Sequence, residues 1–168
     1  MADMTNESTI YVIYIATTAE KCWTALTSAE FSRQYFFGQS IEGDWRKGGR
    51  IMYRTGDGAE HVTGEILDCD RPYFLRFTWR VIGMPSLKQL PDSIVSYRIE
   101  PAGEGVVRLT MTEEHPEPID KRLLEGGRSG WPAILSGLKS LLETGQVPKI
   151  APPQIPQAMA DYMKEHSQ

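Results

Sequence analysis

The feature that most constrains the fold is an amphipathic stretch late in the chain, RSGWPAILSGLKSLLETG at residues 128–145. Its large apolar residues recur at steps of three and four, which places them on one face of a helix: Trp131, Ile134, Leu135, Leu138, Leu141 and Leu142. We expect Ser129 or Gly130 to cap its start, with Pro132 in the first turn. Gly145 suits a left-handed end. Such a helix has to cover another apolar layer, because its apolar face is not stable in water alone.

Most of the chain before this helix is typical of β-strands. Strand-like composition or alternation, bounded by turn residues, predicts strands at 8–17, 40–45, 50–55, 60–70, 73–81, 93–101 and 106–115. We expect 8–17 to be covered on both faces, because it is almost continuously apolar. Gly56-Asp57-Gly58 is a strong hairpin signal, since these residues accept positive φ at low cost. Consecutive strands joined by turns are antiparallel.

Two short helices interrupt this order after the first strand. Thr18 is expected to cap the first of them, TAEKCWTAL, and Ser28 begins the second, which ends before Gly38. The sequence therefore predicts an α+β fold, in which a curved antiparallel sheet of about six to seven strands wraps around the long C-terminal helix. We expect one domain at residues 8–146, preceded by a flexible N-terminus at 1–7.

The last segment, 147–168, is predicted to be a proline-rich linker followed by a short tail helix. Met159, Tyr162 and Met163 would form an apolar stripe on that helix. A short helix of this kind is marginal alone and needs a surface to cover it. We therefore expect it to dock on the domain or on a second subunit, which leaves a homodimer open, with a disordered tail as the alternative.

Composition excludes several classes of protein. A net charge of −4 and a pI near 5.4 disfavour binding of nucleic acid, which usually selects a basic face. No stretch approaches the roughly 20 apolar residues of a membrane span, and MADMTNES lacks the basic end and apolar core of a secretory signal. We expect a cytoplasmic protein whose two cysteines, Cys22 and Cys69, are free thiols.

Three stretches together resemble a known family: IATTAEKCWTALTSAEFSRQYF, GDWRKGGRIMYRTGDGAEHVTGEILDCDRPYFLRFTW and SGWPAILSGLKSLLETG. They are similar in order and spacing to the activator of heat-shock-protein-ninety ATPase homologue-like family, within the START-like (SRPBCC) helix-grip superfamily. The resemblance covers residues 9–145. It implies a helix-grip fold with a deep apolar cavity between the sheet and the last helix. The co-chaperone activity of the family belongs to longer relatives that carry an additional N-terminal domain, for which this chain has no room.

The inward-facing residues of the predicted strands and helix are the candidate cavity wall: Leu75, Phe77, Trp79, Val95, Tyr97, Ile99, Leu109, Met111, Trp131, Leu135 and Leu138. Four aromatic residues could close one end of it: Phe36, Phe37, Trp45 and Tyr53. An apolar cavity with a few polar points is the usual form of a small-molecule site. The alternative is a close-packed core that leaves no room for a ligand.

Two polar residues at the end of the last strand could carry chemistry. Glu113 continues the inward parity of Leu109 and Met111, and His115 lies two residues beyond it. A histidine beside a carboxylate can act in acid–base catalysis, whereas the alternative is a solvated strand end. The other histidines, His61 and His166, have no ligand spacing, so we expect no metal site. We also expect no cofactor, because no phosphate-binding or dinucleotide fingerprint is present.

These observations favour a binding module that holds a small hydrophobic or amphipathic molecule under the long helix. Tyr53, Tyr97 and Glu113 are its candidate polar contacts. One alternative is an acid–base enzyme of the same fold that uses Glu113 and His115, although we consider an enzyme less favoured. A second alternative is a regulator of a heat-shock chaperone ATPase that acts through its surface.

Overall fold

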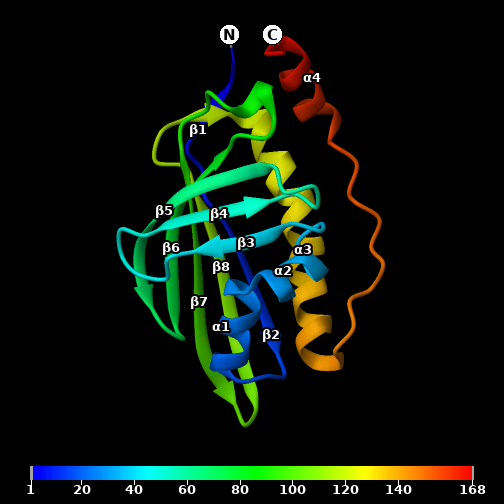
Figure 1. Cartoon of the computed structure of the whole chain (residues 1–168). Helices are drawn as coiled ribbons and strands as arrows, with labels where there is room; N and C mark the ends of the chain where they lie inside the picture. Colours follow the sequence, from blue (N-terminus) through cyan, green and yellow to red (C-terminus); the bar gives the residue numbers. More distant parts are fainter. Residues whose placement is uncertain (1, 168) are drawn as a thin grey trace.

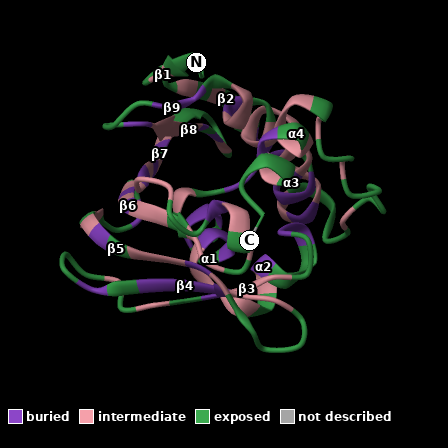
Figure 2. Ribbon diagram, turned by 90° about the horizontal axis from the view of Figure 1, so that it is seen from above, coloured by how far each residue is buried: buried purple, intermediate pink, exposed green. Residues whose placement is uncertain are grey.

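In the computed structural model, which describes residues 2–167, seven strands form one antiparallel sheet in the order β2-β8-β7-β6-β5-β4-β3. The strands are β2 (Thr9–Ile15), β3 (Ser40–Gly43), β4 (Arg50–Arg54), β5 (Glu60–Asp70), β6 (Phe74–Val81), β7 (Ser93–Gly103) and β8 (Val106–Glu114). Seen from above, they form an arc, with the long helix α3 (Leu124–Thr144) in its opening (Figure 2). The predicted α+β class and helix-grip arrangement are confirmed.

Two short helices follow β2, as expected: α1 (Ala19–Thr27) and α2 (Ala29–Tyr35). The Thr18 side chain caps α1 by accepting a hydrogen bond from the Lys21 backbone N–H at 3.2 Å. Ser28 occupies the cap position of α2, but its side chain makes no capping hydrogen bond. The two helices lie beside β3 and the lower half of α3 (Figure 1), and their buried faces join the core.

The start of α3 differs from the expectation. The helix begins at Leu124, so Ser129 and Gly130 do not cap it and Pro132 lies in its interior. The reason is a short 3₁₀ turn, η2 (Lys121–Leu123), which leads straight into α3 and is itself capped by Asp120. The Asp120 carboxylate accepts a hydrogen bond from the Arg122 backbone N–H at 3.0 Å. The end is as expected, because Gly145 has φ +79° and its N–H donates to the Leu141 carbonyl.

Strand β2 is covered on one face only, so the expectation of two covered faces is wrong. Ile10, Val12 and Tyr14 are 63%, 50% and 53% exposed, because the helices pack against the inner face of the sheet only. The free edge of β2 is instead protected by α3. Lys139 Nζ donates to the Tyr14 carbonyl at 2.6 Å, and Glu143 accepts from the Ala16 N–H at 2.8 Å.

A second, two-stranded sheet lies above the main one. Within the stretch expected to be flexible, β1 (Met4–Thr5) pairs with β9 (Ile119–Asp120), a short strand between β8 and α3 that was not predicted from the sequence. After α3, the chain runs up the outside of the helix to α4 (Gln157–Glu165), which lies near β1 at the top of the molecule (Figure 1). The predicted tail helix is therefore present and docked on its own domain.

The core is one cluster that joins the inner face of the sheet to α1, α2 and α3. Across residues 2–167, no helix has the length and apolarity that a membrane span requires. Within the same range, no three His, Cys, Asp or Glu side chains gather in a way that could hold a metal ion.

Candidate ligand-binding site

Most of the expected cavity wall is packed as core. The residues between the middle of the sheet and α3 are at most 3% exposed and contact one another: Leu75, Phe77, Val95, Tyr97, Ile99, Leu109, Met111, Leu135 and Leu138. Trp131 reaches down to the sheet, and its ring centroid lies 5.6 Å from that of Trp79. Side chains therefore fill the space under the middle of the helix.

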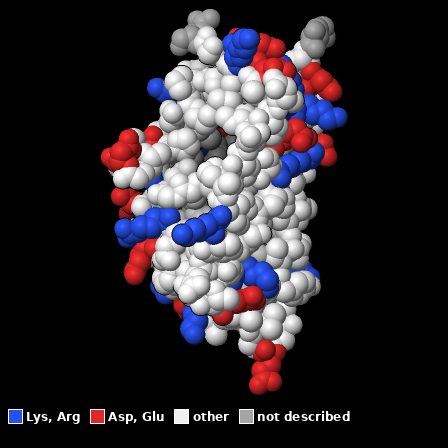
Figure 3. Space-filling model, turned by 90° about the vertical axis from the view of Figure 1, so that its right-hand side faces the viewer, with Lys and Arg blue, Asp and Glu red and all other residues white. Residues whose placement is uncertain are grey.

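A pocket of about 250 Å³ remains at the N-terminal end of α3. It lies between that end of the helix, the ends of β6 to β8, the loop that carries the 3₁₀ turn η1 (Pro85–Leu87), and α4. Its apolar lining comprises Phe36, Phe37, Trp79, Val81, Leu87, Leu90, Pro91, Ile119, Leu123, Trp131, Ile134 and Met159. The surface is hollowed on the side of the molecule that carries α3 and the tail (Figure 3).

Of the sequence candidates, the structure brings six to this pocket: Phe36, Phe37, Trp79, Glu113, His115 and Trp131. Phe36 stacks on Tyr53, with 4.5 Å between ring centroids, but Tyr53 itself belongs to the core. Trp45 is half-buried and packs against the core. Phe37 stands at the mouth, 42% exposed, with a left-handed φ of +50°. An aromatic wall therefore separates the pocket from the core.

Glu113 and His115 form the polar inner end of the pocket. The Trp131 indole N–H donates to Glu113 Oε2 at 3.0 Å, and His115 Nε2 lies 3.4 Å from Glu113 Oε1. The two side chains are only 13% and 8% exposed, so neither is a solvated strand end. Within the described residues, His115 Nε2 has no hydrogen-bond partner.

The other polar candidates lie away from the pocket. Burial raises the pKa of both Tyr53 and Tyr97 well above the ordinary tyrosine value, so both stay protonated in the core. The hydroxyl of Tyr11, which does not line the pocket either, is buried with no partner in the part of the chain that the structure describes. Burial first, and then the charge of Glu113, raises the pKa of Tyr11.

Glycines on α3 allow the pocket its shape. A Cβ on Gly127 would lie 2.9 Å from Glu113 Oε1, and a Cβ on Gly126 would collide with the Met159 sulfur. A Cβ on Gly130 would meet nothing within 4 Å, although this residue also lines the pocket. Side-chain-free positions on one face of the helix therefore let the carboxylate and the tail approach closely.

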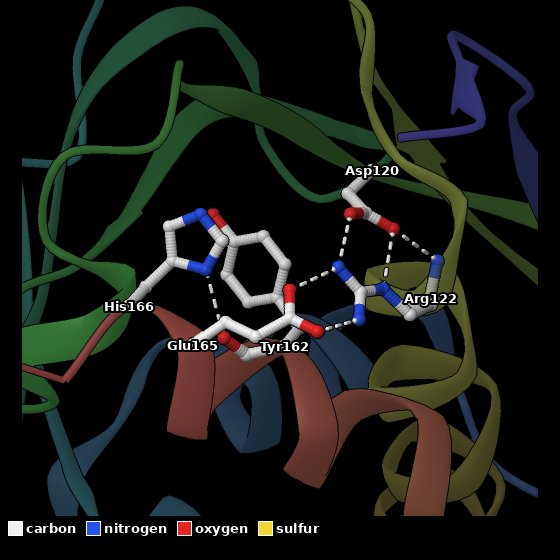
Figure 4. Close-up of polar contacts among 5 residues, drawn as sticks. All are labelled: Asp120, Arg122, Tyr162, Glu165 and His166. Carbon is white, nitrogen blue, oxygen red and sulfur yellow. Dashed lines mark hydrogen bonds and ion pairs between the residues drawn. The ribbon is translucent and has the colours of Figure 1, made fainter. Parts of the chain in front are cut away.

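The tail is held in place by a polar cluster centred on Arg122 (Figure 4). Its guanidinium makes two hydrogen bonds to Glu165, at 2.9 and 2.8 Å, and two to Asp120, at 3.0 and 2.8 Å. The hydrogen bonds from Arg122 lower the pKa of both Asp120 and Glu165. His166 stacks on Tyr162 with 4.0 Å between ring centroids. These contacts keep Met159 at the wall of the pocket.

The sequence interpretation missed the loop and the tail as parts of the site. Leu87, Leu90 and Pro91 fall between the strands predicted at 73–81 and 93–101, and Met159 was recognised as part of an apolar stripe without a known partner. A loop with apolar residues between two inward-facing strands was the only available signal. The placement of Met159 against Gly126 depends on a return of the chain over more than 30 residues.

Known proteins include a family whose sequence pattern matches this chain and several solved structures with a similar fold. The model of the family described as Activator of Hsp90 ATPase homolog 1-like protein matches residues 16–143. Protein MLL2253 from Mesorhizobium loti has a similar structure, with TM-score 0.66 and 23% identity over 81% of this chain and 96% of that one. PFC0360w, an HSP90 activator from Plasmodium falciparum, has TM-score 0.60 and 20% identity over 74% and 86%.

The Aha1 dimer from Colwellia psychrerythraea is also similar, with TM-score 0.65 and 17% identity over 83% of this chain and 98% of that one. At these identities the likeness concerns the fold. No curated protein matches the sequence significantly.

Proposed function

The chain belongs to the Activator of Hsp90 ATPase homolog 1-like protein family, and we propose that it binds a small, mainly apolar molecule at the N-terminal end of α3. One observation carries this proposal: an aromatic pocket of about 250 Å³ has a buried carboxylate and a buried imidazole at its inner end. Apolar walls with a few convergent polar groups are typical of small-molecule sites.

The volume limits the size of the ligand. Pockets for drug-sized molecules usually measure roughly 300–1,000 Å³, so this one suits a molecule of about ten non-hydrogen atoms. For small ligands the binding free energy has a ceiling, which falls from about 1.5 kcal/mol per non-hydrogen atom for the smallest molecules to about 0.3 kcal/mol per atom for drug-sized ones. A binding free energy of about 4 kcal/mol corresponds to a Kd on the order of 1 mM.

Titration with small phenylpropyl compounds tests the proposal. The set comprises 3-phenylpropan-1-ol, its methyl ether, 3-phenylpropanoate and 3-phenylpropylamine. Trp79 and Trp131 line the pocket, so binding should change tryptophan fluorescence and raise the melting temperature. Binding should be lost in Gly130→Met, whose side chain would enter the pocket from a position with open space.

Ser136→Met is the matched control, because it adds the same side chain to an exposed position on the same helix. It should bind as the unchanged protein does. If none of the four compounds binds at concentrations of several millimolar, or if Gly130→Met binds them equally well, the proposal is wrong.

The positions of Glu113 and His115 also favour a second candidate, acid–base catalysis in the same pocket. Both side chains are within reach of a bound molecule, and 3.4 Å separates their nearest polar atoms. A general acid or base must lie within hydrogen-bond reach of the proton that it transfers. Turnover of a bound compound that disappears in Glu113→Gln would support this candidate, and binding without turnover would exclude it for that compound.

Family membership itself favours a third candidate, regulation of a heat-shock chaperone ATPase through the surface of the domain. The similar structure from Plasmodium falciparum is described as an HSP90 activator. A direct assay of ATP hydrolysis by the chaperone, with and without this protein, decides the point. Stimulation that persists in Gly130→Met would separate a surface role from the pocket, whereas no stimulation would exclude the role.

A further inference from the structure

The inner end of the pocket has hydrogen-bonding capacity that the protein does not use. Glu113 Oε2 accepts from Trp131, but Oε1 receives no hydrogen bond from any described residue, and His115 Nε2 has no partner there either. His115 is more than nine-tenths buried and lines the pocket. Buried polar atoms in folded proteins are normally paired, so the buried His115 Nε2, which lies beside Glu113 Oε1, indicates where a bound molecule places its polar group.

The other walls define the body of that molecule. Trp131 lies with ring centroids 5.6 Å from both Phe36 and Trp79, and those two rings are 6.2 Å apart. Aromatic rings favour edge-to-face and offset contacts with further rings at such spacings. An aromatic ring on the ligand therefore suits this wall better than a polar or strongly branched group.

The polar group has to satisfy two unlike atoms. A carboxylate oxygen can only accept a hydrogen bond, while a ring nitrogen that carries its proton can only donate one. Glu113 Oε1 and His115 Nε2 lie 3.4 Å apart, close enough for one oxygen atom to be within hydrogen-bond distance of both. A hydroxyl group can donate to the first and accept from the second.

Charged ligand groups fit less well. A carboxylate on the ligand would be repelled by Glu113. The basic residue in the described lining, Arg80, is already paired with Asp92 at 2.6 Å, so it does not offset this repulsion. An ammonium group can pair with Glu113, but it has no lone pair to accept a hydrogen bond from His115. A hydroxyl avoids both penalties.

We infer that the pocket selects a small aromatic alcohol or phenol, whose hydroxyl donates to Glu113 and accepts from His115. This inference rests on the proposed binding function and names its ligand class. Glu113 and His115 are then the residues that determine specificity, while the aromatic wall and Met159 limit the size of the ligand.

The phenylpropyl set tests this inference in the full-length chain, because its members share one carbon skeleton. We expect 3-phenylpropan-1-ol to bind at least about tenfold more tightly than its methyl ether, which accepts but does not donate a hydrogen bond. The affinity for 3-phenylpropan-1-ol should also be higher than the affinities for 3-phenylpropanoate and 3-phenylpropylamine, by a similar factor. A tenfold preference corresponds to about 1.4 kcal/mol.

Two variants locate the preference. Glu113→Gln removes the charge and should lower the ratio of alcohol to carboxylate affinity by at least about tenfold. His115→Phe removes the ring nitrogens and should weaken the alcohol several-fold more than it weakens the ether. Glu114→Gln is the matched control, because the neighbouring carboxylate pairs with Arg76 and does not line the pocket, so the ratios should stay unchanged.

The outcomes separate this inference from the function on which it rests. If the ether, the carboxylate or the amine binds as tightly as the alcohol, the ligand class is wrong although the pocket binds ligands. An unchanged alcohol-to-carboxylate ratio in folded Glu113→Gln also overturns the inference. If none of the four compounds binds, the proposed function itself fails. Should the variants not fold, the affinity order in the unchanged protein still decides.

Discussion

The glycines of α3 provide a sharp test of how tightly the polar end of the pocket is built. Gly127 and Gly130 both lie within the helix and line the pocket, yet only Gly127 faces the Glu113 carboxylate. Replacement of an interior helical glycine by alanine normally stabilises a protein by about 0.8–1 kcal/mol. Gly130→Ala should gain this amount, because the added Cβ meets nothing within 4 Å.

Gly127→Ala should behave differently. Its Cβ would lie 2.9 Å from Glu113 Oε1, so the carboxylate has to move, although the Trp131 indole N–H, one helical turn further along α3, donates to its Oε2 at 3.0 Å. Loss of a hydrogen bond to a charged group costs about 1.5–3 kcal/mol. With the helix gain subtracted, Gly127→Ala should be about 0.5–2 kcal/mol less stable than the unchanged protein.

Urea unfolding followed by circular dichroism measures this difference. The midpoint should rise for Gly130→Ala and fall for Gly127→Ala at an unchanged m-value. The melting temperature of Gly130→Ala should rise by about 2–4 °C. If Gly127→Ala is as stable as Gly130→Ala, the Glu113 carboxylate is free to move away from the helix, and the polar end of the pocket is not preorganised.

Four further predictions concern the tail, its dependence on pH, the thiols and the core. Arg122→Gln should release α4, seen as faster amide exchange in residues 157–165 with β7 unchanged; equal exchange in the two proteins would contradict the role of Arg122. Acidification should also release α4. The lowered pKa of Asp120 means that its ionised form stabilises the folded state above about pH 4, and this stabilisation is lost as the pH falls through the pKa that Asp120 has in the folded protein. Burial raises the pKa of Cys22 to about 12, so at pH 8 a thiol reagent should label Cys69 and reach Cys22 only after unfolding; labelling of both in the native protein would contradict this. Leu138→Ala should cost about 2–5 kcal/mol in urea unfolding, because Leu138 is fully buried between α3 and the sheet, and a cost below about 1 kcal/mol would show a loose core.

Local signals made much of the fold predictable. The Thr18 cap, the Gly56-Asp57-Gly58 turn and the bounds of β5 depend on neighbouring residues, and the structure confirms each of them. The alternation of Leu75, Phe77 and Trp79 likewise predicted the inner face of β6. Period and turn chemistry carry this information without any knowledge of distant contacts.

Features that depend on distant contacts were not predictable. The start of α3 was placed too late, because Asp120 and η2 form its entrance and Gly126 and Gly127 look like a break. Exposure of one face of β2 depends on which side of the sheet the helices cover. The apolar sequence of the strand does not indicate which side that is.

The candidate site shows the same division. Strand parity identified Glu113 as inward-facing, and His115 was recognised as its neighbour. Whether the aromatic residues would enclose space or fill it depended on packing. Helix α3 lies close to the middle of the sheet, and the remaining pocket is completed by the loop before β7 and by Met159 from the tail.

The central claim is that the pocket at the N-terminal end of α3 binds a ligand. Nuclear magnetic resonance of the full-length protein with 3-phenylpropan-1-ol tests it most directly, through nuclear Overhauser effects between the ligand and assigned side chains. We expect nuclear Overhauser effects from the phenyl ring to Trp131, Phe36 and the Met159 methyl group, and their loss in Gly130→Met. Binding without effects to these residues, or effects confined to the exposed face of β2, would contradict it.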